Sequence, residues 1–207
     1  MAVIETNYLP CIDYFCLIES HSSIALEKFE IFEKQTPRNR CYVNTSQGIA
    51  MLTVPLRGRH GKILTKDVKV ENGNKWRNTH WRTIESAYRK APFFEFYSDE
   101  LKSILFNGHK FLFDLNWDLL SFCLQSLKIN TQLSATMAYE ETSNDFFDLR
   151  NYLSGKKPGN LLASFQIRPY LQVFGNSFVC NLSVIDLLLC CGPNSLQILK
   201  SAQRINN

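Results

Sequence analysis

Apolar and polar positions in the first 32 residues predict a strand, a turn, a helix and a second strand. The run AVIET, residues 2–6, is short and rich in strand-forming residues. After the polar turn of residues 7–11, apolar side chains recur at helical spacing through Ile18. Pro10 is expected at the first helical position, where a backbone N–H has no partner in any case. Residues 23–32 mix alternation with an apolar run, so strand and helix compete, and we favour a strand followed by a loop.

Two further strands and a long helix are predicted next. The strands flank the turn NTSQG, residues 44–48, and the second one, Ile49 to Leu56, is apolar on both faces. Such a strand is typical of the centre of a sheet. The segment NKWRNTHWRTIESAYRK, residues 74–90, is the clearest helix, with Asn74 as its expected cap. Its positions four apart, from Trp76 to Tyr88, share one face.

Helical periodicity dominates the rest of the chain. Amphipathic patterns predict helices in YSDELKSILFNG and DLNWDLLSFCLQSLKI, and an apolar one in LSVIDLLLCCGP. Strands and helices alternate early and helices dominate later, which favours an α/β fold with a partly parallel sheet. A length of 207 residues fits one domain. Within it we expect an α/β ligand-binding half, residues 1–97, and a mainly helical half, residues 98–207.

Composition excludes several classes. Hydrophobic residues make up 45% of the chain, which is enough for a packed core. We see no signal peptide and no apolar run of membrane-spanning length, so a cytoplasmic protein is expected. The seven cysteines are odd in number and lack a CxxC pair, which favours free thiols over disulfides or a zinc site. Nucleotide-binding glycine loops and catalytic serine or metal motifs are missing, so no metal and no cofactor is predicted.

Positive charge is concentrated in one window. Residues 38–90 hold 12 of the 23 Lys and Arg but only three acids, which gives this window +9 within a chain of net +4. That polarisation favours an anionic small-molecule ligand, although a solvated basic face is the alternative. Nucleic-acid binding is disfavoured because no known recognition motif accompanies the window.

Two segments in the first half could bind such a ligand. Asn7 and Tyr8 lie in the turn after the first strand, where α/β proteins bind ligands if the sheet is parallel. The alternative is a structural turn with a packed tyrosine. Arg38, Asn39 and Arg40 follow in TPRNR, and an extended chain would point both guanidiniums to one side, as phosphate or carboxylate recognition requires. The alternative is a pair of surface arginines.

Two later segments could add chemistry. His80 lies between Trp76 and Trp81 in the sequence. It is either a proton carrier that is partly shielded from solvent or an ordinary core histidine. In RPYLQVFG, residues 168–175, Gln172 is a candidate ligand contact. Asp186 interrupts an apolar helix and needs a partner if buried, for which we expect Arg168 or an arginine of the first half. It is then either a structural ion pair or an acid of the site.

These segments together resemble the WbqC-like family of bacterial proteins. Members typically open with QPNYLPWxGYF, and the corresponding run here is ETNYLPCIDYF. Further matching segments are LTVPL, the long run KDVKVENGNKWRNTHWRTIESAYRKAPFFEFY, RPYLQVFG and LSVIDLLLCCGP. The chain departs from the pattern at Thr6, Cys11 and Asp13, where the family usually has glutamine, tryptophan and glycine.

The resemblance implies a direction for function. Family members often occur among genes for surface polysaccharides, which implies a transferase that attaches an acyl or amino-acyl group, such as glycine, to a nucleotide-linked amino sugar in O-antigen-type biosynthesis. The opening strand, turn and helix are also similar to Rossmann-like nucleotidyltransferases, so such an enzyme is an alternative, as is a non-catalytic module that binds a nucleotide or a partner protein.

On this interpretation we assign roles to ten residues, two catalytic and eight substrate-binding. His80 would move the proton and Tyr8 would position the acceptor beside it. The substrate-binding residues would be Asn7, Arg38, Asn39, Arg40, Arg57, Trp76, Trp81 and Gln172.

Overall fold

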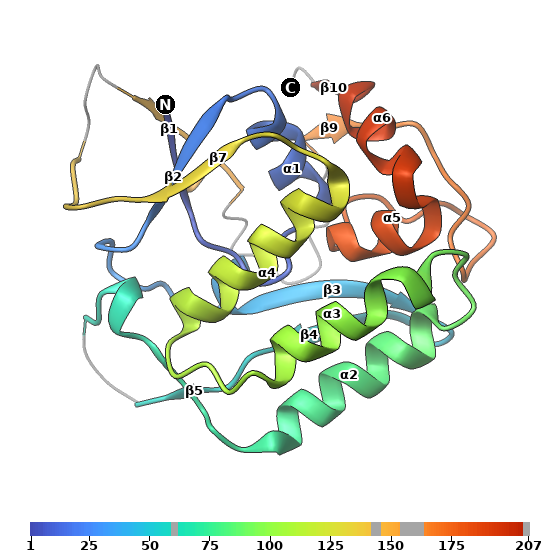
Figure 1. The fold of residues 1–207 in the computed structure, drawn as a ribbon, viewed down its shortest axis with the longest axis horizontal. Helices are drawn as coiled ribbons and strands as arrows, with labels where there is room; N and C mark the ends of the chain where they lie inside the picture. The colour runs from blue at the N-terminus through green and yellow to red at the C-terminus, as the bar shows by residue number, and fades with distance from the viewer. Residues whose placement is uncertain (59–61, 142–145, 154–163, 205–207) are drawn as a thin grey trace.

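Four short parallel strands form the main sheet of the computed structural model, which describes residues 1–58, 62–141, 146–153 and 164–204 (Figure 1). The strands lie in the order β7 (Gln132–Ala135), β2 (Ser23–Glu27), β1 (Ala2–Glu5) and β8 (Phe147–Asp148), all parallel. Numbered along the chain this order is 3-2-1-4, which matches the first four strands of the Rossmann order 3-2-1-4-5-6. The predicted α/β architecture, with helices around the sheet and a mainly helical C-terminal half, is confirmed.

The opening segment folds as its pattern indicates. β1 is buried at all four positions because it is paired on both edges, and α1 (Ile12–Glu19) connects it to β2. The prediction for Pro10 is wrong by two residues, since Cys11 is the N-cap and Ile12 the first helical residue. The Pro10 carbonyl instead accepts a hydrogen bond of 2.9 Å from the Val184 N–H, which ties this turn to the C-terminal part.

Three consecutive helices cover the middle of the chain. In Figure 1, α3 (Phe94–Phe106) lies between α2 (Asn74–Tyr88) and α4 (Leu112–Leu127), and it packs on both. The apolar face of α2 is buried as predicted, with Ile84 and Tyr88 fully inaccessible. Asn74 is not the cap, because Gly73 occupies that position and no side chain caps the helix.

The hairpin of β3 (Arg40–Thr45) and β4 (Gly48–Thr53) corrects another prediction. It is a two-stranded antiparallel sheet of its own, so β4 is not a central strand. Leu52 faces the core, whereas Ile49 and Met51 are 48% and 47% exposed. A strand with apolar residues on both faces therefore does not need to bury both of these faces, because the surface of a folded protein also contains many apolar atoms.

The remaining elements are short. α5 (Val184–Cys191) packs against α2, α3 and α4, and no helix in the described ranges is long and apolar enough to cross a bilayer. The described cysteines form no disulfide, as predicted. The other elements are the 3-10 turns Pro37–Asn39, Thr65–Asp67 and Gly192–Asn194, the strands β5 (Leu56–Arg57), β6 (Lys69–Val70), β9 (Phe165–Gln166) and β10 (Gln203–Arg204), and α6 (Ser195–Lys200).

Candidate functional site

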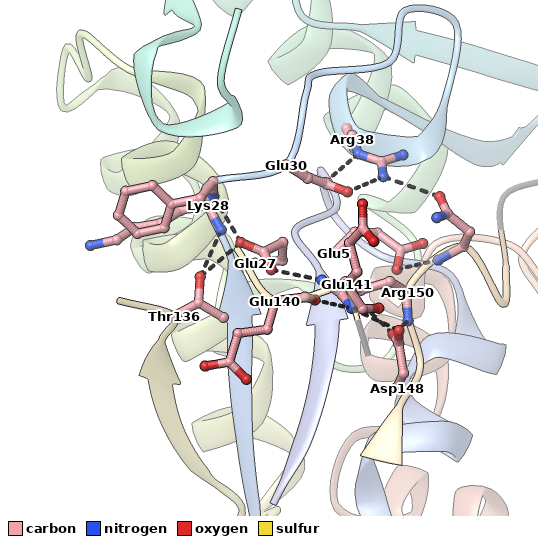
Figure 2. Close-up of polar contacts among 12 residues, drawn as sticks. Glu5, Glu27, Lys28, Glu30, Arg38, Thr136, Glu140, Glu141, Asp148 and Arg150 are labelled. Atoms are coloured by element: carbon pink, nitrogen blue, oxygen red, sulfur yellow. Dashed lines mark hydrogen bonds and ion pairs between the residues drawn. The ribbon is translucent and has the colours of Figure 1, made fainter. Parts of the chain in front are cut away.

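Acidic side chains gather where the parallel strands end (Figure 2). Glu5 is the last residue of β1, and Glu27, its register partner, is the last residue of β2. Asp148 ends β8 on the other side of β1. The strand order reverses between β1 and β8, and open α/β sheets bind their ligands at such a reversal, outside the carboxyl ends of the strands. This edge of the sheet is therefore the first place to look for a site.

Two buried arginines balance part of this negative charge. Arg38 Nε and Nη2 each donate to one carboxylate oxygen of Glu30 at 2.7 Å. Arg150 donates to Asp148 at 2.7 Å and 2.9 Å and to Glu27 at 3.1 Å. Both arginines therefore hold fixed ion pairs, and the bidentate geometry makes the pair at Glu30 specific as well as strong.

Glu5 lies between these pairs without joining either. Its side chain is almost fully buried, and its Oε2 accepts a hydrogen bond of 3.1 Å from the Asn151 backbone N–H. Burial raises the pKa of the Glu5 carboxyl, while the nearby Arg38 charge opposes that rise. Within the described ranges no cation contacts the Glu5 carboxylate.

Several buried polar atoms of the segments that follow this edge have no hydrogen-bond partner among the described residues. They occur on two segments, the turn after β1 and the start of β3, which are joined where the Tyr8 N–H donates to the Pro37 carbonyl at 3.0 Å. Buried polar atoms are nearly always paired, so such a group marks a place where water or a ligand is bound. The atoms on these segments are Thr6 Oγ1, Asn7 Oδ1, Arg38 Nη1, Asn39 Oδ1 and Arg40 Nε.

Tyr8 also links the turn to helix α2. Its hydroxyl lies 2.9 Å from His80 Nδ1, and both side chains are buried. Burial lowers the pKa of His80 to about 4, against a smaller opposing contribution from a hydrogen bond to the Thr53 backbone. His80 is therefore neutral at pH 7, and its Nδ1 accepts a hydrogen bond from the Tyr8 hydroxyl.

His80 also lines a cavity of about 410 Å³. This volume is in the range of small-molecule pockets, and its walls are mainly apolar. Arg40 stands opposite Thr53, one of the lining residues, at the base of the hairpin. His80 thus contacts both the cavity and the turn after β1. The cavity is lined by Met51, Leu52, Thr53, Pro55, Glu71, Gly73, Lys75, Trp76, Thr79 and His80.

Tyr8 links the three predicted segments, through its backbone contact with Pro37 and its hydroxyl contact with His80. Of the ten predicted site residues, the cavity lining includes Trp76 and His80 and none of the other eight. The expectation that Arg38 and Arg40 extend to one side is wrong, because Arg38 lies in a 3-10 turn and faces Glu30. The aromatic neighbours of His80 are Trp76 and Tyr8, at centroid distances of 5.1 Å and 5.6 Å.

Trp81 and Arg57 lie elsewhere. A helix turns about 100° per residue, so Trp81 points away from His80 and packs on Phe94 of α3. The prediction of a histidine held between two indoles is therefore wrong. Arg57 is exposed on β5, where it pairs with Lys69 in register, and residues 59–61 of its basic loop lie outside the described residues.

Gln172 belongs to a second buried network, centred on Asp186. Asp186 Oδ2 accepts hydrogen bonds from the Tyr170 hydroxyl at 2.6 Å and the Gln172 amide at 2.9 Å, and Tyr88 contributes another. Gln172 also exchanges two hydrogen bonds with the backbone of Val179. The expected arginine partner of Asp186 is thus wrong, because hydroxyl and amide donors take its place at Oδ2, and burial raises the pKa of the carboxyl. Its Oδ1 is buried and has no hydrogen-bond partner among the described residues.

The sequence analysis did not predict Glu5 or Glu30 as residues of the site. Glu5 closes the first strand, and the position of a carboxylate at a strand end was the signal available. Its significance depends on its neighbours β2 and β8, which lie 20 or more residues away in the chain. No three His, Cys, Asp or Glu side chains in the described part of the chain gather in a way that could hold a metal ion.

Comparison with known proteins gives one family and one relative. The model of the WbqC-like protein family matches residues 6–157. An uncharacterized protein of Mycobacterium tuberculosis (strain ATCC 25618 / H37Rv), Rv1507c, is 34% identical over 228 residues, which covers 97% of each chain. No solved structure matches the chain.

Proposed function

The chain belongs to the WbqC-like protein family, and from that premise we propose that it is a cytoplasmic transferase of surface-polysaccharide biosynthesis. It attaches an acyl or amino-acyl group, such as glycine, to a nucleotide-linked amino sugar of the O-antigen type. The sugar nitrogen attacks the carbonyl carbon of the activated donor, so a C–N bond forms, the bond to the leaving group breaks, and a proton leaves the nitrogen. No metal or cofactor is needed for this step.

The observation that carries the proposal is the 2.9 Å contact between Tyr8 and His80. It joins the turn after β1, at the ligand-binding edge of the sheet, to a cavity of about 410 Å³. A proton taken up at the Tyr8 oxygen can be passed to His80 Nδ1, because the hydroxyl donates along that bond. Asn7 positions the acceptor beside Tyr8.

Anionic groups of the substrate are assigned to the basic residues around the turn. Arg38 keeps the two N–H groups of Nη1 for oxygen acceptors, and Arg40 keeps the N–H of Nε, each unpaired with any described residue. Asn39 supports this segment through a hydrogen bond of 3.0 Å to the Val54 carbonyl. Arg57 contributes a charge from the surface of β5 rather than a contact at the turn.

Two aromatic residues shape the substrate cavity in this proposal. Trp76 forms part of its wall and is held by a hydrogen bond of 2.9 Å from Nε1 to the Glu71 carbonyl. Trp81 supports the helix from its other side, against Phe94.

Turnover of His80 variants tests the proposal. The protein is incubated with a nucleotide-linked amino sugar and an activated acyl or glycyl donor, and the product is identified by mass. His80→Asn keeps a hydrogen-bond acceptor for Tyr8 and should lower turnover by about 100-fold, the usual contribution of acid–base catalysis. His109→Asn is the matched control, since His109 pairs with Asp118 outside the site. Equal turnover of both variants would remove His80 from the reaction.

A non-catalytic binding module is the second candidate, and the low pKa of His80 favours it. A neutral imidazole with a pKa of about 4 is a weak base at pH 7. Isothermal titration with nucleotide-sugars separates the two functions. Binding without any product of changed mass would support the module, and a product would support the transferase.

A further inference from the structure

Glu5 differs from the other buried glutamates at this edge of the sheet. Glu27 and Glu30 are each held by an arginine, at 3.1 Å and 2.7 Å. Glu5, just as buried, forms no ion pair with a described residue, and its carboxylate accepts backbone hydrogen bonds from Asn151 and from its own N–H. Burying a carboxylate that forms no ion pair costs free energy, and such groups are found mainly at functional sites.

The charges around Glu5 favour a positively charged ligand. We count the formal charges of the strand-end acids and of the residues in the ion pairs shown in Figure 2. The acids are Glu5, Glu27, Glu30 and Asp148, and the cations are Arg38 and Arg150. The balance is therefore two negative charges, although the chain as a whole is +4. One cationic group bound at Glu5 would halve this excess in a region where charges interact strongly.

Polar atoms without a described partner occur beside Glu5 in space, on Arg38, and next to it in the chain, on Thr6 and Asn7. Asn151 bridges Glu5 to Arg38, because its N–H donates to Glu5 and its Oδ1 accepts from Arg38 Nη2 at 3.4 Å. Arg38 Nη1, nearly inaccessible to solvent, has no acceptor among the residues described. Thr6 Oγ1 and Asn7 Oδ1 follow Glu5 directly and are likewise buried without a partner in the described chain.

These atoms define the chemistry of a ligand. A carboxylate with two neutral oxygens suits a group that carries several N–H donors and a positive charge, which is a primary ammonium. The N–H groups of Arg38 Nη1, which have no described acceptor, suit an oxygen atom on the same ligand. A fully anionic ligand does not fit here, since it would meet the unpaired Glu5 charge.

We propose that Glu5 binds the primary ammonium group of a substrate, with Thr6 and Asn7 as further acceptors and Arg38 Nη1 as donor to a neighbouring oxygen. The inference rests on the proposed transferase function and deepens it, because it gives the amine-bearing substrate a position at the reversal of strand order. Two substrates of that function carry such a group: an amino sugar and an amino-acyl unit.

Matched pairs of small probes test the requirement for the ammonium. The first pair is glucosamine and N-acetylglucosamine, and the second is glycine and N-acetylglycine. Acetylation removes the positive charge of the ammonium group and leaves the remainder of each molecule unchanged. Binding is followed by NMR titration of the whole protein at pH 7. The amine of at least one pair should bind about tenfold tighter than its acetylated partner, the effect of one charged hydrogen bond. The pair that responds identifies an amino sugar or an amino acid as the source.

Substitution at Glu5 and at its register partner completes the test. Glu5→Gln keeps the acceptor for Asn151 and should remove the preference for the amine. Glu27→Gln makes the same change on the neighbouring strand, breaks an ion pair with Arg150 and should keep the preference. Equal binding of amines and acetylated partners, no binding of either amine, or an unchanged preference in Glu5→Gln would each overturn the proposal.

The outcome is separable from that of the transferase test. Amine-selective binding that depends on Glu5, without any transfer product, would retain this site and reject the transferase. A product whose formation does not depend on Glu5 would retain the transferase and reject this site.

Discussion

The buried His80 predicts a specific loss of stability in acid. Its pKa is about 4 in the folded protein, whereas an exposed histidine titrates near 6.5. Between these values the unfolded chain binds a proton that the folded chain does not, so the free energy of unfolding falls as the pH falls. Integrated from pH 7 to pH 4, this difference amounts to about 3 kcal/mol.

The effect is isolated by comparing the protein with His80→Asn. Asn cannot titrate but still offers an acceptor for the Tyr8 hydroxyl, so the variant should lose the contribution of position 80 to the pH dependence. Asp13 works in the opposite direction, since burial raises its pKa to about 6 and its protonation favours the folded state in acid. The difference between the two proteins cancels Asp13 and leaves His80.

Urea unfolding at pH 7 and at pH 4.5 measures this difference. From pH 7 to pH 4.5 the native protein should lose about 2.5 kcal/mol more than His80→Asn. Tyr8→Phe serves as control, because it removes the hydroxyl and retains the imidazole. Its free energy of unfolding should therefore decrease between pH 7 and pH 4.5 by as much as that of the native protein. Identical pH dependence of the native protein and His80→Asn would refute the reasoning, since it would mean that His80 binds its proton equally well in both states.

Two further predictions concern the buried polar networks. Glu30→Gln leaves the Arg38 charge without its partner and should lower the free energy of unfolding by about 3–5 kcal/mol, whereas Arg38→Met with Glu30→Leu should lose less, as urea unfolding would show. Asp186→Leu leaves the Tyr170 hydroxyl and the Gln172 amide unpaired and should cost about 2–4 kcal/mol. Asp186→Asn, which retains an acceptor, should cost less than half of that by the same measurement, and equal losses in either comparison would contradict the assigned contacts.

Local pattern determined much of the architecture. The apolar run of β1, the helical spacing of α1 and the four-residue repeat on α2 each report which side of an element is apolar, and neighbouring residues alone set that property. The same pattern failed at Ile49 and Met51, because an apolar face shows what can be buried and not what covers it. Among the described strands, β4 pairs with β3 alone and is not part of the parallel sheet.

The partners of the buried charges were decided only by the tertiary structure. The sequence indicated that Asp186 needs a partner and that Arg38 suits an anion, but Asp186 meets Tyr170 and Gln172 while Arg38 meets Glu30. An ion pair depends on the approach of side chains in space, over a few ångströms, and chain separation does not report that distance. Glu5 is the clearest case: its sequence position shows a strand end, and only the packing of β2 and β8 beside it leaves the carboxylate buried without an ion pair to a described residue.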